Sequence, residues 1–478
     1  MEETDNRRPV IAITGASGYI GRNLMAELKK HADIIALSRN IDTKENEEHV
    51  TWRSCDLFSL KDAEEALEGA DYALYLVHSM MPTSKLTQGR FEDMDVILAD
   101  NFARAAEQKQ VKQVVYLSGI IPEAEHLSRH LSSRLEVENI LKSYRTPVTA
   151  IRAGLIVGPQ GSSFPILAKL VKRLPVMVLP KWTQTKTHPI ALADVLNSLQ
   201  KSIGEESLYN RSIDVGGPDV MTYRKMMGIT SKVMGKKRYA VTVPFFTVRL
   251  SRLWVSVTTG TPKSLVYPLI ESLIHPMVAD PAKSVKGISD GKISFEEAAE
   301  NSLKESRKEQ SSILARLKPA PVERNVRSVQ RVTIPSGRDA DWTARYYIKW
   351  LPKLLRPFVK VETTDRYLYG LRPAFMKRTF LELSYSKERS EEDRALYYIT
   401  GGLLAQVNKG ERGRLEFRKI PHTNQCIVAV HDYVPAMPWY FYQYTQAFIH
   451  LWIMNRFKAH LEKDQWTLRR SRQLQPES

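Results

Sequence analysis

The fold is decided near the start of the chain by the stretch Thr14-Gly15-Ala16-Ser17-Gly18-Tyr19-Ile20-Gly21. A short apolar run rich in β-branched residues, 9–13, precedes this stretch, and residues 22–29 follow it with apolar side chains at helical spacing. The order is therefore strand, glycine-rich turn and helix. Such a unit is typical of a pyrophosphate-binding site, because the helix N-terminus offers free N–H groups and a positive dipole end. The alternative is a structural turn that binds nothing.

Each glycine of this stretch has a distinct expected role. Gly15 allows a tight turn after the strand, Gly18 leaves room for a pyrophosphate against bare backbone, and Gly21 allows close packing of the helix. The predicted cofactor-binding loop comprises Gly15, Ala16, Ser17, Gly18, Tyr19, Ile20 and Gly21.

The spacing Gly15-x-x-Gly18-x-x-Gly21 resembles that of the extended and atypical short-chain dehydrogenase/reductase (SDR) proteins. Residues 9–305 are similar to NmrA-like atypical SDR proteins and to the nucleotide-binding accessory subunit of respiratory complex I. The resemblance rests on the glycine loop, Ser118, Arg134 to Glu138 and Arg152 to Gly158. It implies an α/β fold with a Rossmann doubly wound parallel sheet, and NADP or NAD as the cofactor.

Arg39 bears on the choice between the two cofactors. It follows the predicted second strand, 32–37, and lies 18 residues past Gly21. An arginine at this place suits the 2′-phosphate of NADP, whereas an acidic residue would bind the 2′-hydroxyl of NAD. We therefore expect NADPH to be preferred, with NAD possible; the alternative is a solvated surface arginine.

Further strands are expected at 50–57, 72–79, 111–119 and 148–159. The resemblance implies that Asp56 and Leu57 lie beside the adenine. It also implies that Val77 and His78 line the cofactor, although the family's Asn-Ala-Gly motif is missing there. His78 could contact the cofactor or the substrate, or it could be a polar residue at a strand end.

The predicted catalytic residues are Ser118, His130 and Arg134. By resemblance, Ser118 is the active-site serine that orients a substrate carbonyl, while His130 and Arg134 replace the family's Tyr-x-x-x-Lys pair on one helix face. His130 could act as an acid near neutral pH, although a cation one turn away disfavours its protonated form. Arg134 could hold the nicotinamide ribose. The alternative is a site that binds nucleotide and catalyses nothing.

Composition narrows the possible domain number, partners, metal sites and location of the protein. The 478 residues suggest two or three domains, and the net charge of +17 is compatible with an anionic membrane surface or an acidic partner. No nucleic-acid-binding signature is present, so we expect no nucleic acid partner. The two cysteines have no disulfide or zinc spacing, which predicts no metal site and a cytoplasmic location. The acidic start lacks a signal-peptide core, and no apolar run predicts a membrane-spanning helix.

We expect an NAD(P)-binding domain with a substrate-side cap at 1–305, a charged linker at 306–331, a C-terminal domain at 332–470 and a basic, polar tail at 471–478. Residues 240–280 are apolar with interspersed basic residues. They are interpreted as a packed substrate-side cap or, alternatively, as a surface that touches membrane or a lipophilic substrate, which would make the protein membrane-associated.

The C-terminal domain is expected to contain strands at 381–385, 414–418 and 426–433 and a long helix at 439–460. The segments 413–417, 431–432 and 439–460 resemble a domain of unknown function that is fused to NAD(P)-binding modules and related to the Bet v 1/START-like (SRPBCC) superfamily. The resemblance implies an α+β, helix-grip-like fold with a ligand cavity, which His431, Asp432 and Trp439 would line. The alternative is a packed core helix without a ligand.

Two classes of function follow from these observations. The first is an NADPH-dependent oxidoreductase that acts on a small hydrophobic carbonyl or quinone substrate. The second is a non-catalytic NAD(P)H-binding sensor or an assembly or regulatory factor. The altered pair His130 and Arg134 is the feature that distinguishes these two classes of function. The sequence predicts neither the substrate nor the oligomeric state.

Overall fold

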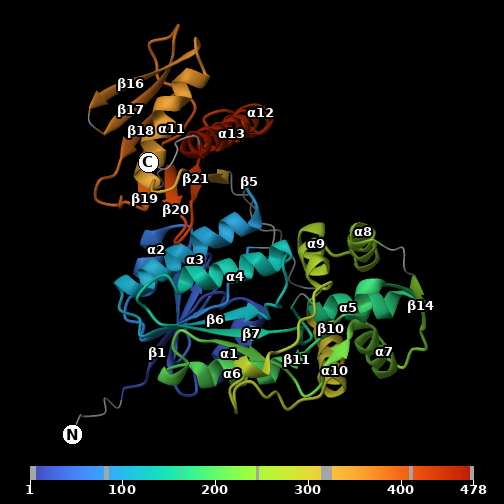
Figure 1. Ribbon diagram of the computed structural model, residues 1–478. Helices are drawn as coiled ribbons and strands as arrows, with labels where there is room; N and C mark the ends of the chain where they lie inside the picture. The colour runs from blue at the N-terminus through green and yellow to red at the C-terminus, as the bar shows by residue number, and fades with distance from the viewer. Residues whose placement is uncertain are drawn as a thin grey trace. The chain divides into compact units, whose positions relative to one another are not determined.

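The computed structural model describes residues 7–79, 86–161, 163–243, 247–313, 326–365, 367–407 and 413–473. The chain divides into two compact units (Figure 1). Unit 1 comprises residues 1–81 and 95–318, and unit 2 comprises residues 82–94 and 319–478.

The central sheet of unit 1 has seven parallel strands within the described residues, in the order β12-β7-β6-β4-β1-β2-β3. The strands are β1 (Val10–Ile13), β2 (Asp33–Ser38), β3 (Val50–Ser54), β4 (Tyr72–Tyr75), β6 (Gln113–Gly119), β7 (Val148–Ala153) and β12 (Ser212–Val215). The strand order reverses at β1, which lies between β2 and β4. Ligands of such sheets bind at this switch point, beyond the carboxyl ends of the strands. The predicted Rossmann fold is confirmed.

Helices cover both faces of this sheet. They are α1 (Tyr19–Leu28), α2 (Leu60–Ala66), α3 (Phe91–Gln108), α4 (Arg129–Leu141) and α6 (Leu192–Ser202). Figure 1 shows α3 and α4 on one face and α1 and α6 on the other. The strands form nearly continuous apolar runs because both of their faces are buried; Ile13 and Ile151, for example, are fully buried.

The rest of unit 1 packs around a second apolar core. Its main elements are α5 (Ser163–Arg173), β9 (Val176–Pro180), α7 (Tyr223–Val233), β14 (Tyr239–Val243), α8 (Val248–Thr259), α9 (Lys263–Ser272) and α10 (Phe295–Ile313). Short strands pair β8 (Ile156–Val157) with β11 (Ile190–Ala191) and β10 (Lys186–Thr187) with β13 (Met221–Thr222). Short 3-10 helices lie at Lys181–Gln184, Glu206–Leu208 and Pro281–Lys283.

Unit 2 is built on a sheet whose described strands run in the order β16-β17-β18-β19-β20-β21-β15-β5. Their bounds are β5 (Leu86–Gln88), β15 (Val326–Thr333), β16 (Val359–Asp365), β17 (Leu368–Pro373), β18 (Leu381–Tyr385), β19 (Arg394–Gly401), β20 (Arg414–Lys419) and β21 (Gln425–Tyr433). The helices α11 (Ala340–Leu354), α12 (Trp439–Tyr444) and α13 (Gln446–Gln473) complete the unit. One apolar core joins α11 and α13 to Leu415 and Phe417, which alternate along β20 with charged residues.

The predicted domain boundaries differ from the structure in three places. The segment 82–94, predicted inside the first domain, belongs to unit 2, because β5 pairs in parallel with β15. In the predicted linker 306–331, α10 continues to Ile313 and β15 begins at Val326, while 314–325 lie outside the described residues. The valines of β15 are buried, which explains a strand where the charge pattern indicated a linker. In the predicted tail, α13 continues to Gln473, and 474–478 are not described.

The predicted helix 439–460 is two helices. The backbone of Thr445 has φ −122° and ψ −82°, which is not helical, and α13 then extends to Gln473. Across the part of the chain that is described, no helix is both long enough and apolar enough to span a bilayer.

Candidate functional site

The turn between β1 and α1 requires glycine at Gly15 and Gly21 and leaves little room for a side chain at Gly18. Gly15 has a φ of +68°, a conformation that side chains disfavour. A Cβ atom on Gly18 would lie 3.0 Å from the carbonyl oxygen of Gly15, and one on Gly21 would lie 2.3 Å from the same oxygen. Gly21 therefore allows α1 to pack closely against the turn itself.

The N-terminus of α1 is open to an anion. Its N-cap, Gly18, supplies no side-chain hydrogen bond, and no acidic residue lies in the first turn. The Thr14 hydroxyl fixes the turn against β4, since it donates to the carbonyl of Leu74 (3.1 Å) and accepts from the N–H of Leu76 (2.9 Å). The helix dipole and the first N–H groups therefore suit a phosphate.

The other residues of the predicted loop have defined places. Ala16 is buried, and Ile20 packs against the core of the sheet. The Ser17 hydroxyl donates to that of Ser38 at the end of β2 (3.1 Å). A Cβ on Gly158 would lie 2.6 Å from the hydroxyl oxygen of Tyr19, so this ring rests on the loop after β8.

Arg39 follows β2 directly and is exposed. Asp56 and Leu57 follow β3, the neighbour of β2 in the sheet. The Asp56 carboxylate accepts the N–H of Phe58 (3.2 Å), whereas Leu57 is buried and its carbonyl accepts from Asn101 (2.8 Å). The predicted adenosine-binding positions therefore lie at neighbouring strand ends on the carboxyl edge of the sheet.

Val77 and His78 lie just beyond β4, whose last residue is Tyr75. His78 Nδ1 is 2.8 Å from Oδ2 of Asp95, a buried residue of α3. The other carboxylate oxygen of Asp95 accepts the N–H of Ser79 (2.8 Å), and Ser133 donates to Oδ2 (3.2 Å). The sequence analysis missed Asp95; the available signal was a carboxylate beside the apolar run 96–99.

The structure brings His78 and His130 together. Their ring centroids are 5.3 Å apart, and His130 Nδ1 lies 3.2 Å from the hydroxyl of Ser272, at the end of α9. The same hydroxyl is 2.8 Å from that of Ser128. A residue of α9, outside the central sheet, thus joins the predicted site, and no local sequence signal links it to His130.

Arg134 is paired with a tyrosine that the sequence analysis did not select. Its guanidinium donates to the hydroxyl of Tyr116 on β6 (3.4 Å). Ser118 lies two residues further along β6 and is buried. Burial raises the pKa of Tyr116 despite the nearby Arg134, so the phenol stays protonated at neutral pH.

Burial also sets the charge of the two histidines. The pKa of His130 lies well below its usual range because the ring is desolvated, and His78 and Arg134 lower it further. Burial and Arg134 lower the pKa of His78 as well, against the pull of Asp95. The pKa of Asp95 is lowered because His78 and Arg134 outweigh burial. Both imidazoles are therefore neutral at pH 7, and the prediction that His130 acts as an acid near neutral pH is revised to a more acidic range.

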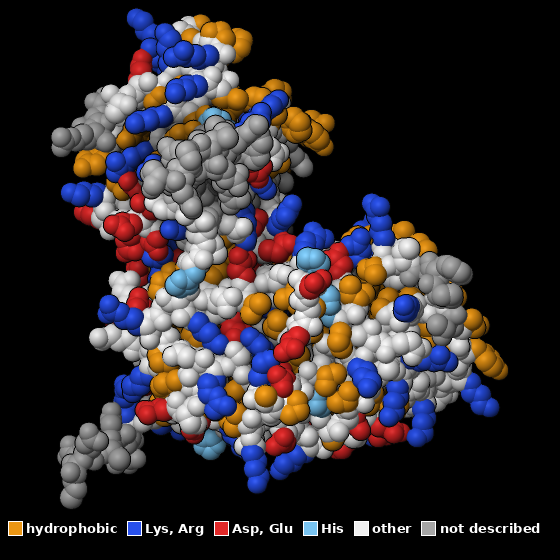
Figure 2. Space-filling view, viewed as in Figure 1, with side chains coloured by type: hydrophobic (Ala, Val, Ile, Leu, Met, Phe, Trp, Pro, Cys, Tyr) orange, Lys and Arg blue, Asp and Glu red, His pale blue; other side chains and the backbone are white. Residues whose placement is uncertain are grey.

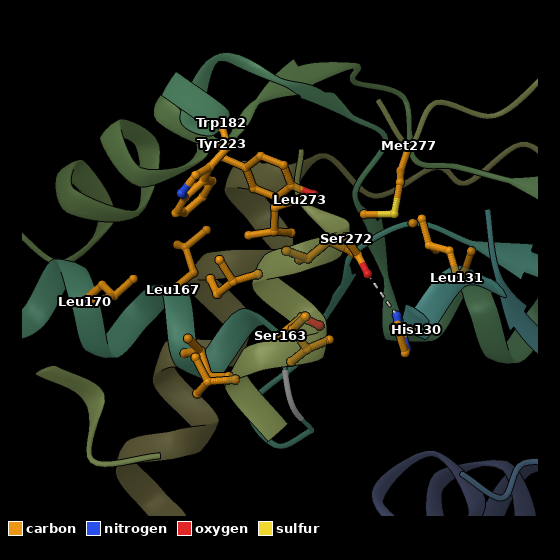
Figure 3. Close-up of a pocket in the computed structure, with 18 of the residues that line it drawn as sticks. His130, Leu131, Ser163, Leu167, Leu170, Trp182, Tyr223, Ser272, Leu273 and Met277 are labelled. Carbon is orange, nitrogen blue, oxygen red and sulfur yellow. Dashed lines mark hydrogen bonds between the residues drawn. The ribbon is translucent and has the colours of Figure 1, made fainter. Parts of the chain in front are cut away.

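An apolar cavity opens beside His130 (Figure 3). It begins at the ends of β6 and β7, at Gly119 and Ala153, and continues between α5, α7 and α9. Its wall includes Leu131, Leu167, Leu170, Trp182, Tyr223, Leu273 and Met277. The cavity volume is about 120 Å³, and a single water needs only about 10–15 Å³. The cavity therefore suits an apolar group of several atoms, with His130 and Ser272 as polar contacts at one end.

The cavity-lining residues predicted for the C-terminal domain do not share one environment. His431 is fully buried, with Nε2 3.8 Å from the Glu416 carboxylate, and Asp432 accepts from Arg414 (2.5 Å). Trp439 packs against the apolar core on the Phe417 face of the sheet. Within the described residues, no cluster of three or more His, Cys, Asp or Glu side chains could hold a metal ion.

Part of unit 1 is similar to known NAD(P)H-binding proteins. Residues 15–156 match a family of NAD(P)H-binding domains. The auxiliary protein GraX of Staphylococcus aureus (strain NCTC 8325 / PS 47) is 33% identical over 144 residues, which are 30% of this chain and 43% of GraX. The match therefore spans less than half of that relative.

Solved structures that are similar to the chain include an epimerase and a quinone oxidoreductase. A nucleoside-diphosphate-sugar epimerase from Staphylococcus aureus has a TM-score of 0.50 and 14% identity, over 61% of this chain and 99% of the epimerase. An NADPH-dependent quinone oxidoreductase from Escherichia coli has a TM-score of 0.48 and 19% identity, over 60% and 98% of the two chains. The epimerase shows that the fold of unit 1 is shared.

The family match ends before the C-terminal domain, whose resemblance to Bet v 1/START-like proteins stays a prediction. For unit 1, the strand order, the glycine loop and the matched segment all indicate a nucleotide-binding fold. Residues 15–156 form an NAD(P)H-binding domain with a Rossmann fold.

Proposed function

We propose that the protein is an NADPH-dependent reductase of an apolar carbonyl or quinone substrate. The observation that carries this proposal is the apolar cavity that runs from the ends of β6 and β7 to His130. The nicotinamide of a dinucleotide held at the β1–α1 turn reaches this side of the switch point in folds of this kind. The protein is proposed to work in the cytoplasm, which fits its two buried, unpaired cysteines.

The proposed roles follow from the chain's own groups. The N-terminus of α1 binds the pyrophosphate, and Arg39 pairs with the 2′-phosphate, which favours NADPH over NADH. When bound, NADPH supplies the hydride. Ser118 and His130 orient the substrate oxygen, and the apolar wall excludes water from it. Protonated His130 donates the proton, and Asp95 holds the neighbouring His78 in place.

This assignment predicts a pH profile. A general acid is active only while it carries its proton, and the pKa of His130 lies well below its ordinary value. Turnover should therefore fall as the pH rises through the acidic range below about 6.5. A fall that begins only above neutral pH would contradict His130 as the acid.

NADPH oxidation against a panel of quinones and hydrophobic carbonyls tests the proposal. We expect turnover in the wild type and a loss of about 10²-fold or more in His130→Ala, with unchanged NADPH affinity. His126→Ala is the matched control, because His126 is exposed in the loop before α4. Equal turnover in wild type and His130→Ala would remove His130 from the mechanism.

A second candidate is a non-catalytic NAD(P)H sensor or regulatory factor. Two observations favour it: both histidines are neutral at pH 7, and the only tyrosine hydrogen-bonded to Arg134 in the described structure is fully buried, with a raised pKa. Tight NADPH binding without turnover on any substrate of the panel would support this second function and contradict the first.

A further inference from the structure

One surface of unit 1 exposes apolar side chains in a row. On α8, the residues Leu250, Leu253 and Val257 follow the spacing of a single helix face. On the paired strands β9 and β14, Val176 lies opposite Tyr239, and Val241 is also exposed. The exposed fractions of Val257 and Tyr239 are 72% and 73%, which is unusual for side chains of this type. We call these six residues the α8–β14 surface.

The end of α5 joins the two parts of this surface. Arg173 donates to the carbonyl of Thr258 on α8 (2.6 Å), and Arg238, just before β14, donates to the carbonyl of Val171 (2.8 Å). Figure 2 shows hydrophobic side chains with Lys and Arg side chains among them over this part of unit 1, where Figure 1 labels α8 and β14. The exposed apolar residues of α8 and of β14 therefore belong to elements that flank the same end of α5.

The segment of chain that carries α8 and β14 has charges of one sign. Residues 220–270 contain nine Lys and Arg and no Asp or Glu, whereas the whole chain has 70 basic and 53 acidic residues. Lys172, Lys236, Lys237 and Arg249 are all exposed. Apolar side chains rimmed by cations match the two layers of an anionic bilayer surface, where acyl chains lie beneath negative headgroups.

We propose that the α8–β14 surface docks unit 1 on a bilayer that contains anionic lipids. The apolar stripe enters the headgroup boundary, and the basic residues pair with phosphate groups. Leu250, Leu253 and Val257 lie on the outer face of α8, so no membrane-spanning segment is needed.

The inner face of the same helix packs against residues of the cavity wall. Ser251 accepts a hydrogen bond from the indole N–H of Trp182, a cavity residue (3.2 Å), and Val255 packs in one core with Val266 of the cavity wall. A docked bilayer would thus lie one helix away from the cavity. That an apolar substrate reaches the cavity from the bilayer rests on the proposed function; the docking itself does not.

Sedimentation of the full-length protein with vesicles tests the docking. The vesicles contain phosphatidylcholine alone or with 30% phosphatidylglycerol, at low and high salt. We expect binding to the anionic vesicles, weakened by salt, and little binding to phosphatidylcholine alone. Val257→Asp should lower the partition coefficient by about tenfold or more, and Arg249→Glu by about fivefold or more.

Two control variants match these changes. Phe375→Asp places the same charge at an equally exposed apolar residue of unit 2, and Lys61→Glu reverses a charge on α2. Both should bind vesicles like the wild type. NADPH binding and circular dichroism show that each variant is folded, and neither readout depends on turnover.

Three results would overturn the proposal. They are no binding to either vesicle, binding that the controls weaken as much as Val257→Asp does, and a wild-type dimer that Val257→Asp dissociates in light scattering. The last result would assign the surface to contacts between copies of the chain.

Discussion

We predict that Arg39 sets the cofactor preference through one charge. It lies directly after β2, beside the end of β3, and it is exposed without an ion pair among the described residues. A guanidinium at this strand end meets the 2′-position of the adenosine ribose. We therefore expect the contribution of Arg39 to cofactor binding to depend on the presence of the 2′-phosphate.

Arg39→Asp should weaken NADPH binding by about tenfold or more, because a charge-assisted hydrogen bond contributes about 1.5–3 kcal/mol. NADH affinity should hold or improve, and Arg39→Lys should retain part of the preference. Fluorescence titration of both cofactors measures this. Equal affinities of the wild type for NADPH and NADH would contradict the role of Arg39.

At the scale of elements, the β1–α1 turn and the contact of α4 with β7 hold the site in place. The turn depends on the absence of side chains near the Gly15 carbonyl. The contact depends on charge: Glu138 of α4 accepts two hydrogen bonds from Arg152 of β7, both 2.9 Å, and one from Lys142 (2.8 Å). Arg152 and Lys142 lower the pKa of Glu138 although its burial opposes this.

Gly18→Val tests the turn. A Cβ at Gly18 is already 3.0 Å from the Gly15 carbonyl oxygen, and the two further methyl groups would occupy the approach to the α1 N-terminus. Nucleotide binding should be lost while far-UV circular dichroism stays near that of the wild type. Normal binding by a folded Gly18→Val protein would show that the pyrophosphate lies elsewhere.

Arg152→Ala tests the contact between α4 and β7. It leaves a carboxylate that is 1% exposed without its main partner, which should lower the free energy of unfolding by about 3–5 kcal/mol. Lys142→Ala is the control and should cost less, because Lys142 is partly exposed. Urea unfolding measures both. A loss below about 1 kcal/mol in Arg152→Ala would mean that Glu138 gains water or a proton at little cost.

At the scale of the whole molecule, the two units respond to acid through different groups. Unit 2 contains His450, whose Nε2 is 3.0 Å from the Ser328 hydroxyl and whose pKa burial lowers to about 4. Below about pH 6.5 the unfolded state binds a proton at His450. The folded state binds this proton only below about pH 4. Stability from the neutral ring is therefore present above pH 6.5 and is lost as the pH falls through that window.

Between pH 7.5 and 5, this group should cost about 2 kcal/mol of stability. His450→Gln should remove that part of the pH dependence, and the exposed His422→Gln should not. Calorimetric unfolding at both pH values measures the difference. An unchanged pH dependence in His450→Gln would show that folding does not lower the pKa of His450.

The sequence by itself determined the features that short stretches encode. The strand–turn–helix unit around Gly15 and the apolar runs of the parallel sheet were predictable, since each depends on residues within one or two elements. The place of Arg39 after β2 follows from the same local pattern. Ser118, His130 and Arg134 were selected by resemblance, and the structure puts all three on β6 and α4.

Tertiary structure alone decided the partners of those residues. Asp95 meets His78 from 17 residues away, Tyr116 meets Arg134 from 18, and Ser272 meets His130 from 142. The assignment of β5 to the sheet of unit 2 was decided in the same way. Local patterns predict periodicity and turns, whereas contacts and burial, and with them the neutral state of His130, depend on how distant segments pack.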